Sequence, residues 1–266
     1  MAYPDRCVWT GVGRVVAVGD VHGDFDQFTG ILQYADLIDS EFNWIGGKAH
    51  LVQLGDVLDR GADSRAVMDL IIRLEQQAPL QGGCVHFILG NHEIMVMQAD
   101  LRYVHQGEIQ SYGGVKEMIR ALRPDGEYGR WLSEHSTAIR INNALFVHGG
   151  LSGEFAMMPL DSLNAMVRRE ISGDQSDASG ILSSQGPVWF RGYAEDRGTA
   201  VTEELTASLE STGCDFTVIA HSVSMAGVST RFSGRAVMID TGMSECYGGT
   251  AQCIVLDQRG YKTLIP

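Results

Sequence analysis

Short apolar runs that end in glycine and polar residues recur through the first third of the chain. Residues 14–18 read RVVAV, residues 51–54 read LVQL and residues 85–89 read VHFIL, and each run has the composition of a buried β-strand. Helical patterns follow these runs, so the region predicts three successive strand–loop–helix units. Because such units form a largely parallel sheet covered by helices, the chain is predicted to be an α/β protein.

Apolar residues return at helical spacing after the first two of these strands. One amphipathic stretch covers about 24–35 and a second covers about 63–74. Asp24 is placed to cap the first helix, and Asp63 or Ser64 to cap the second. The pattern therefore predicts two helices, each beginning just after the loop that follows a strand.

The rest of the chain is less repetitive. We expect one domain over residues 1–266, with two packed sheets and a helical insertion at about 94–136. The further predicted elements are a hairpin of strands at 137–141 and 144–147, a helix from Asp161 or Ser162, a polar loop at 173–184, a helix at 202–211, and strands at 216–219, 236–240 and 252–257. The last two strands suggest a second sheet that is mixed or antiparallel.

Composition limits the partners of the protein. Of the 266 residues, 44% are hydrophobic and 20% are charged, which is ordinary for a soluble globular protein. The formal net charge of −13 argues against nucleic acid and against an anionic membrane surface as partners. It does not argue against an anionic substrate, because exposed charge is screened while a bound cation acts locally.

Neither the cysteines nor the N-terminal residues predict an extracellular protein. The five cysteines are scattered and never spaced as Cys-x-x-Cys, so the sequence predicts neither a disulfide framework nor a zinc finger. Residues 1–13 lack the basic and apolar regions of a signal peptide, and no apolar run approaches the roughly 18 residues that span a bilayer. We expect a cytoplasmic protein, although a removed leader would leave no trace.

Side chains that can bind metal ions stand where the predicted strands end. They are Asp20, His22, Asp56, Asn91, His148 and His221. Loops at the carboxyl ends of strands are the usual place for ligands in an α/β sheet. The mixture of oxygen and nitrogen donors favours Mn, Fe, Zn or Co over Ca. Six ligands are too many for one tetrahedral ion, so we predict two divalent metal ions that share Asp56, with Mn as the first choice.

The charges of such a centre fit phosphate chemistry. Two divalent ions and two aspartates leave a charge of about +2, which a phosphomonoester dianion neutralises. Bound metal ions also lower the pKa of water from about 15.7 towards about 7, which supplies a hydroxide nucleophile at neutral pH. The sequence therefore predicts direct attack of a metal-bridging hydroxide on phosphorus, without a side-chain nucleophile.

Other motif residues are candidates for catalysis and substrate binding. Arg60 and Arg191, together with Asn91, are expected to hold phosphate oxygens. His92 directly follows Asn91 and is the candidate that protonates the leaving oxygen. Asp59 is expected to orient this imidazole and keep it protonated, because a nearby carboxylate raises the pKa of a histidine.

Each residue has a simpler explanation when it is taken alone. An isolated Asp-x-His after a strand is more often a turn, and a lone buried histidine is more often hydrogen-bonded in a core. Glu93 is expected to hold one of the motif arginines. The histidines that match no motif are expected to be structural, and they are His50, His86, His105 and His135. The occurrence of all the motifs in order, each at a strand end, favours a catalytic site.

The combined motifs resemble those of the calcineurin-like metallophosphoesterases. The motifs that carry the resemblance are GDVHG at 19–23, GDVLDRG at 55–61, GNHE at 90–93, HGG at 148–150 and the late His221. The DRG and HE details resemble the phosphoprotein phosphatase branch. The segment GPVWFRG at 186–192 is similar to the bacterial Shewanella-like and Rhizobiales-like phosphatases of that branch.

The resemblance implies a four-layer α/β/β/α sandwich of two mixed sheets, with a dinuclear metal site between the sheets. It implies an acid pair of His92 and Asp59, and phosphate binding by Arg60 and Arg191. The implied ligands are Asp20, His22 and Asp56 for one ion, and Asp56, Asn91, His148 and His221 for the other.

The predicted function is a metal-dependent phosphomonoester hydrolase, a protein phosphatase that acts on phosphotyrosine, phosphoserine/threonine or both in a protein or peptide. The alternatives are a nucleotide phosphohydrolase of the diadenosine polyphosphate type and a catalytically silent phosphate-binding scaffold. Residues 240–247 read DTGMSECY and lack the SAPNYC-type motif of eukaryotic relatives, so no regulatory subunit is expected. The rim of the pocket is predicted at Met157, Met158, Tyr193, Met243 and Tyr247.

Overall fold

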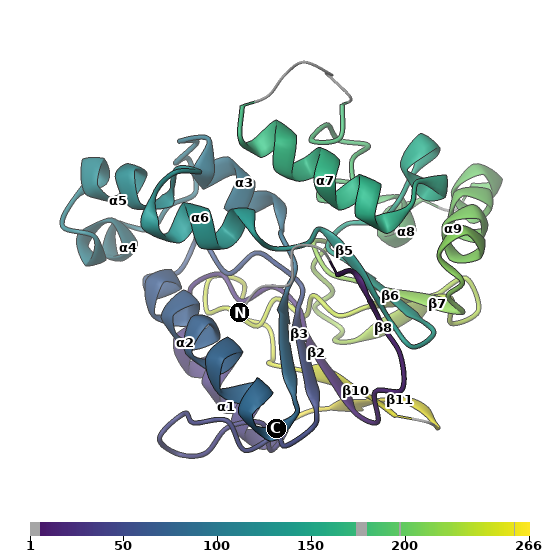
Figure 1. Ribbon diagram of the computed structural model, residues 1–266, viewed down its shortest axis with the longest axis horizontal. Coiled ribbons are helices and arrows are strands. Elements are labelled where there is room, and N and C mark those ends of the chain that lie inside the picture. Colours follow the sequence, from purple (N-terminus) through teal and green to yellow (C-terminus); the bar gives the residue numbers. More distant parts are fainter. Residues whose placement is uncertain (1–5, 174–179, 197, 258) are drawn as a thin grey trace.

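Two β-sheets lie face to face in the protein, and helices cover the outer face of each sheet (Figure 1). The computed structural model describes residues 6–173, 180–196, 198–257 and 259–266. The layers follow the order helix, sheet, sheet, helix, and both sheets contain parallel and antiparallel pairs. The predicted α/β/β/α sandwich of two mixed sheets is therefore confirmed.

The five-stranded sheet contains the three parallel strands that the sequence predicts. β2 (Val15–Val18) pairs with β3 (His50–Gln53), and β3 pairs with β4 (Cys84–Phe87). On the other side of β2, the sheet continues with antiparallel β10 (Cys253–Asp257) and then β11 (Gly260–Leu264). The expectation that β10 belongs to a second sheet is wrong. Alternation along a strand defines its two faces but not its neighbour, and β10 lies more than 200 residues from β2 in the sequence.

The six-stranded sheet has the order β1-β5-β6-β7-β9-β8. The predicted hairpin is confirmed as the antiparallel pair β5–β6, and Asn142 in its turn has a φ of 56°, a conformation that asparagine tolerates. The bounds of the strands are Val8–Trp9 for β1, Ala138–Ile141 for β5, Ala144–Val147 for β6, Phe216–Ile219 for β7, Ser229–Arg231 for β8 and Ala236–Met238 for β9. The sequence pattern missed β1, β8 and β11, of which the first two have only two and three residues.

Helices α1 (Phe25–Tyr34) and α2 (Ser64–Gln77) cover the five-stranded sheet, as predicted (Figure 1). Asp24 caps α1, since its Oδ1 accepts a hydrogen bond of 3.0 Å from the backbone N–H of Gln27. Asp63 precedes α2 without a side-chain cap. Each helix therefore begins directly after a polar loop: α1 after the loop that follows β2, and α2 after the loop that follows β3.

The remaining helices lie beside the site or over the six-stranded sheet (Figure 1). Their bounds are Asn91–Met97 for α3, Gln106–Ser111 for α4, Val115–Leu122 for α5, Glu127–Ser133 for α6, Leu160–Ile171 for α7, Gly192–Glu195 for α8 and Thr199–Thr212 for α9, with 3₁₀ turns at Ala78–Gln81 and Gly153–Met157. The range 94–136 contains the end of α3 and the helices α4, α5 and α6. The predicted loop at 173–184 includes residues 174–179, which lie outside the described part of the chain.

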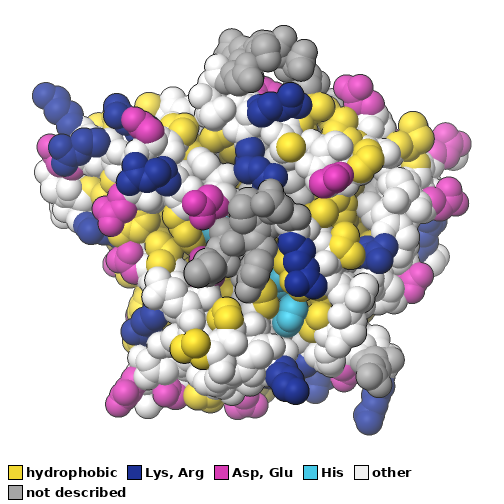
Figure 2. Space-filling model, viewed as in Figure 1, with side chains coloured by type: hydrophobic (Ala, Val, Ile, Leu, Met, Phe, Trp, Pro, Cys, Tyr) yellow, Lys and Arg dark blue, Asp and Glu magenta, His cyan; other side chains and the backbone are white. Residues whose placement is uncertain are grey.

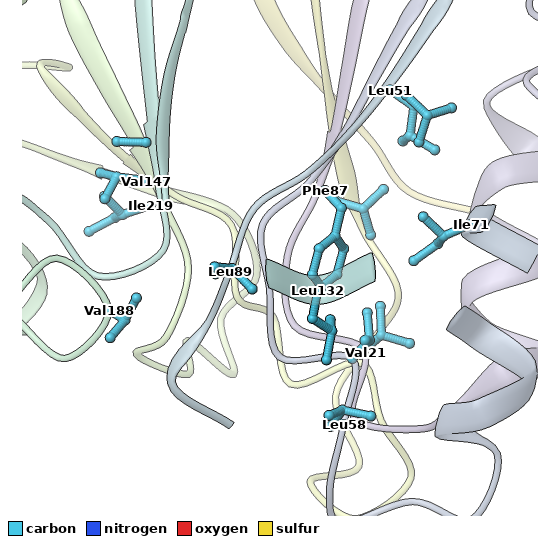
Figure 3. Packing of buried hydrophobic residues seen from close by; sticks show 14 of the residues in the cluster. Val21, Leu51, Leu58, Ile71, Phe87, Leu89, Leu132, Val147, Val188 and Ile219 are labelled. Atoms are coloured by element: carbon cyan, nitrogen blue, oxygen red, sulfur yellow. The ribbon is translucent and has the colours of Figure 1, made fainter. Parts of the chain in front are cut away.

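Alternating side chains of the strands build the layers of the core. In β2, Val16 and Val18 face the helices, whereas Val15 and Ala17 face the other sheet. Figure 3 shows the helix-facing cluster around both sheets, with Val147 and Leu51 on opposite sides of Leu89. Each buried Val, Leu or Ile stabilises the fold by about 1.5–3 kcal/mol relative to an exposed one. In the described residues, no helix combines the length and apolarity needed to cross a membrane.

Candidate metal centre

The six predicted ligands converge at one end of the two sheets, although they come from five separate segments. Asp20 and His22 follow β2, Asp56 follows β3 and Asn91 begins the helix after β4. The other two ligands follow strands of the second sheet, and they are His148 after β6 and His221 after β7. The site therefore lies between the carboxyl ends of parallel strands from both sheets.

Asp56 is at the centre of this arrangement. Its Oδ2 lies 3.2 Å from Nε2 of His148 and 4.0 Å from Nε2 of His22. Asn91 Oδ1 lies 3.1 Å from the same Nε2 of His148, and Asp20 Oδ2 lies 3.9 Å from Nε2 of His22. His22 with Asp20 and His148 with Asn91 therefore form two groups of donors that both lie beside the carboxylate of Asp56.

Two sets of donor atoms in this centre are close enough to hold metal ions. One set is His22, Asp56 and His92, and the other is Asp56, His148 and His221, with all donors of a set within 4.8 Å of one another. The first set contains His92, which the sequence predicts as the acid, and Asp20 lies beside it. The shared Asp56 agrees with the predicted bridging role.

Backbone carbonyls fix the orientation of two of the imidazoles. Nδ1 of His22 donates to the carbonyl of Leu58 at 2.9 Å, and Nδ1 of His148 donates to the carbonyl of Leu54 at 2.6 Å. Both rings therefore turn Nε2 towards the site, as in many metal-binding histidines. His221 has the opposite orientation, because its Nε2 faces the Trp189 carbonyl at 3.1 Å, which leaves Nδ1 as its donor to the site.

The buried carboxylates require positive charge. Asp20, Asp56 and Asp240 are 3%, 1% and 0% exposed, respectively. Burial, followed by the repulsion of Asp240 and Asp56, raises the pKa of Asp20 well above its usual range. Oδ2 of Asp240 has no hydrogen-bond partner in the described part of the protein. Burial also keeps two histidines neutral, since it lowers the pKa of His22 to about 4 and that of His221 to about 2. Closely packed carboxylates beside neutral imidazoles fit divalent metal ions.

His92 and Asp59 form a buried pair at the edge of the centre. Nδ1 of His92 lies 2.5 Å from Oδ2 of Asp59, and its Nε2 lies 3.9 Å from Oδ2 of Asp56. Burial lowers the pKa of His92, but the carboxylates of Asp56 and Asp59 outweigh this effect and raise it above the ordinary value. These contacts therefore favour the protonated form of His92, whose Nε2 points towards the site.

Arg60 is held between two aromatic rings. Its guanidinium carbon lies 5.0 Å from the ring centroid of Tyr103 and 5.0 Å from that of Tyr247. The backbone of Asp59 and Arg60 has φ values of 68° and 69°, a conformation that ordinary residues rarely adopt. Nε of Arg60 is buried and has no hydrogen-bond partner among the described residues. Its donor capacity therefore remains available.

Arg191 reaches the site from the segment before α8. One of its terminal nitrogens donates to the carbonyl of His221 at 2.7 Å and to Oγ of Ser222 at 3.0 Å. The contact ties this segment to the loop that carries His221. The structure thus brings Arg191 to the second-sheet side of the centre, whereas Arg60 belongs to the first-sheet side.

The role expected for Glu93 is wrong, because its carboxylate binds backbone amides and not an arginine. It accepts hydrogen bonds of 2.8–3.2 Å from the N–H groups of Gly90, Asp56, Val57 and Leu58. These bonds join the loop after β3 to the turn before α3. Glu93 therefore fixes the backbone that presents Asp56. Its bond to Gly90 is a local capping contact of α3, whereas its three bonds to the loop after β3 depend on the fold.

Sequence reasoning also missed Asp240 and Tyr103. Asp240 ends the apolar run at 236–240, so the strand-end pattern used for the other ligands could have found it. The predicted pocket rim is only partly right: Tyr247 contacts Arg60, but Tyr193 and Met243 are 0% and 1% exposed. Seven of the eight histidines of the chain are buried, and little histidine surface is visible in Figure 2.

The chain is similar over most of its length to several known proteins. An uncharacterised protein of Schizosaccharomyces pombe is 33% identical over 94% of this chain and 79% of its own length. Shewanella-like protein phosphatase 2 of Arabidopsis thaliana is 28% identical over 91% of this chain and 74% of its own. The cold-active protein-tyrosine phosphatase of a Shewanella species superposes with a TM-score of 0.87 at 30% identity, over 100% of this chain and 81% of its own.

The family model described as calcineurin-like phosphoesterase matches residues 13–225, a range that includes the predicted ligands and the His92–Asp59 pair. This chain belongs to the calcineurin-like phosphoesterase family.

Proposed function

We propose that this protein is a metal-dependent protein phosphatase that hydrolyses phosphomonoesters of phosphorylated proteins or peptides. The observation that carries the proposal is the meeting of two donor groups at Asp56, with His92 and Arg60 beside them. Members of this family use two divalent metal ions. The relatives named as protein phosphatases and the neighbour named as a protein-tyrosine phosphatase support a phosphoprotein substrate.

The predicted ligands divide between two metal positions. Asp20, His22 and Asp56 would hold one ion, and Asp56, Asn91, His148 and His221 would hold the other. Mixed oxygen and nitrogen donors favour Mn, with Fe, Zn and Co as alternatives. The chemistry supplied at such a centre is Lewis-acid polarisation of phosphoryl oxygens and activation of a water molecule for attack.

His92 is the residue that we assign to proton transfer. Its Nδ1 is held by Asp59, so the proton that it can donate is on Nε2, the atom that faces Asp56. In this position it protonates the oxygen that leaves phosphorus. A general acid of this kind accelerates a reaction by about 10²–10⁴-fold.

Three side chains are assigned to the phosphate. Arg60 supplies an unpaired Nε from a guanidinium fixed between Tyr103 and Tyr247. Arg191 approaches from the opposite sheet, where its contact with the His221 carbonyl fixes it. Asn91 contributes from the start of α3. Two arginines on opposite sides can bind a tetrahedral phosphate and offset the charge of its transition state.

Phosphate release from matched phosphotyrosine and phosphothreonine peptides tests the proposal. We expect release with added Mn²⁺ and none after chelation, with phosphotyrosine as the better substrate, as the name of the Shewanella neighbour suggests. A diadenosine polyphosphate serves as the competing substrate. Faster hydrolysis of the dinucleotide than of either peptide would overturn the assignment, and binding of two metals without any hydrolysis would indicate a silent scaffold.

A further inference from the structure

Three side chains with metal-binding donors lie together at the amino ends of β3 and β4, the end of the sheet opposite the centre described above. His50 begins β3, and Cys84 begins β4 two residues before His86. Their exposed fractions are 9%, 4% and 5%. His50 pairs with Cys84 in the strand register, and residues two apart in a strand share a face, so all three point to the same side.

That side faces the other sheet, where the pattern of the strands requires apolar residues. The neighbours on this face of β2, β3 and β4 and the loops that follow them belong to the inter-sheet core, and they are Val15, Ala17, Val52, Leu54 and Ile88. A thiol and two imidazoles replace apolar side chains at the end of this layer. Burial of polar groups costs free energy unless they find partners, and the proposed phosphatase chemistry uses none of the three.

His86 contacts both of the other side chains, through different nitrogens of its ring. Nε2 of His86 and Nδ1 of His50 are 2.9 Å apart, and Sγ of Cys84 lies 3.9 Å from Nδ1 of His86. One donor atom from each residue lies within 4.8 Å of the other two. A tetrahedral zinc ion binds nitrogen at about 2.0–2.1 Å and sulfur at about 2.3 Å, which requires donors about 3.3–3.8 Å apart. The side chains therefore have to rotate to enclose an ion, because the 2.9 Å contact between the two imidazoles must widen and His86 must turn one nitrogen towards both partners.

The protonation states suit a metal. Burial lowers the pKa of His50 to about 4, and burial followed by the charge of His50 lowers the pKa of His86 well below its usual range. Both imidazoles are thus neutral at pH 7, and the proton now shared between Nε2 of His86 and Nδ1 of His50 moves to the other nitrogen of its ring when the ion binds. The thiol of Cys84 loses its proton to water when the ion binds, so one proton is released per ion.

A cavity gives access to the cluster. Its volume is about 730 Å³, and its lining includes His50 and Cys84 together with Gly11, Gly13 and Gly83. His86 lies deeper, beneath the ring of Trp9, with ring centroids 4.4 Å apart. A water molecule in the cavity can supply a fourth ligand, since zinc sites with three protein ligands commonly retain one.

The charged side chains around the cavity indicate which metal ions the cluster can bind. Arg6, Arg14 and Lys48 also line it, and no aspartate or glutamate does so among the described residues. Such surroundings disfavour Mg²⁺, Ca²⁺ and Mn²⁺, which bind through carboxylates and other oxygens. They favour a thiolate, because nearby cations stabilise its charge. An ion bound here must gain its affinity from sulfur and imidazole nitrogen, the donors that zinc prefers.

We propose that His50, Cys84 and His86 form a third metal site, separate from the dinuclear centre. The site binds a divalent ion that prefers thiolate ligands, and Zn²⁺ is the expected ion.

A cobalt titration of the metal-stripped full-length protein tests this site without reference to activity. Co²⁺ bound to a thiolate gives a sulfur-to-cobalt charge-transfer band in the near ultraviolet, and none of the six ligands proposed for the dinuclear centre is a cysteine. We expect the band to saturate at one ion per chain and to disappear when Zn²⁺ is added. A wild-type protein without this band would overturn the proposal.

Cys84→Ser should remove the band, whereas Cys253→Ser should retain it. Cys253 is the matched control because it is a buried cysteine of the same sheet that faces the helix side. A band of equal strength in Cys84→Ser would reject the site. If this variant fails to fold, His50→Gln is the second variant, and it should weaken cobalt binding at the sulfur site by at least about 10-fold.

The melting temperature tests whether His50, Cys84 and His86 bind a metal ion or only contribute to packing. Zn²⁺ should raise the melting temperature of the wild-type protein more than that of Cys84→Ser, because only the wild type gains binding free energy at this end of the sheet. Phosphatase activity with Mn²⁺ should be the same for both proteins. Equal stabilisation of the two proteins by Zn²⁺ would contradict the proposal while leaving the phosphatase assignment intact.

Discussion

The two ends of the same parallel strands carry different chemistry. At the carboxyl ends, the candidate ligands other than Asn91 lie on loops that contain glycine and positive φ values, and backbone carbonyls orient His22 and His148. At the amino ends, His50, Cys84 and His86 lie within regular strands and contact mainly one another. The comparison shows that loops can gather many ligands from distant segments, whereas strands provide only those that their register places on one face.

Asp56→Asn is expected to have the largest effect, because it removes the carboxylate that the two proposed metal positions at the carboxyl ends share. Loss of this carboxylate should reduce kcat/KM by at least about 10³-fold, because metal ions contribute several kcal/mol to transition-state stabilisation. Metal analysis should show loss of Mn²⁺ from the protein but retention of Zn²⁺ at the amino-end site. Asp257→Asn, at an exposed strand end, is the control. Loss of Zn²⁺ together with Mn²⁺ would show that the two ends are not independent.

His92→Asn should reduce kcat by about 10²–10⁴-fold without loss of metal. The decrease should be larger for an alkyl phosphate than for an aryl phosphate, since a poorer leaving group needs the proton more. The wild-type rate should fall as the pH rises through the raised pKa of His92, because only the protonated imidazole can donate. A pH–rate profile that keeps this basic limb in His92→Asn would assign the limb to another group.

Tyr247→Ala should raise KM by about 2–30-fold, because it removes one of the two rings that hold Arg60 and a cation–π contact contributes about 0.5–2 kcal/mol. Tyr247→Phe keeps the ring and should behave like the wild type. Steady-state kinetics with a phosphotyrosine peptide measures both variants. Equal losses in the two would assign the effect to the phenol oxygen and not to the ring.

Glu108→Gln should have the smallest effect on activity, and it concerns the support of the carboxyl-end loops by α4. Burial raises the pKa of Glu108 to about 8, and its Oε2 accepts a hydrogen bond of 2.9 Å from Ser64. Since the unfolded carboxyl group ionises near about 4.3, the folded state binds more protons, and stability falls as the pH rises from about 4.3 to about 8.

The substitution should flatten this pH dependence and stabilise the protein by about 1–3 kcal/mol at pH 8. Denaturant unfolding at several pH values measures the change. Glu117→Gln, at an exposed position of α5, is the control. An unfolding free energy of Glu108→Gln that depends on pH as strongly as that of the wild type would rule out this residue as the cause.

The sequence predicted the chemistry of the carboxyl ends more completely than the architecture around it. Strand-end motifs picked out six candidate ligands that the fold brings together, because each motif is local and because parallel strands end at the same edge. The same pattern would have found Asp240, which ends an apolar run in the same way. Glu93 was misread, since three of its four amide partners lie in a loop 35–37 residues earlier in the chain.

Sequence by itself determined which residues face a core, where the polar clusters lie along the chain, and which chemistry those clusters support. Only the tertiary structure decided that β10 joins β2, that Tyr103 and Tyr247 enclose Arg60, and that His50 meets Cys84 and His86. Local periodicity records which side of a strand is buried. It does not record which distant segment covers that side, because this choice depends on packing and hydrogen bonding between residues far apart in the chain.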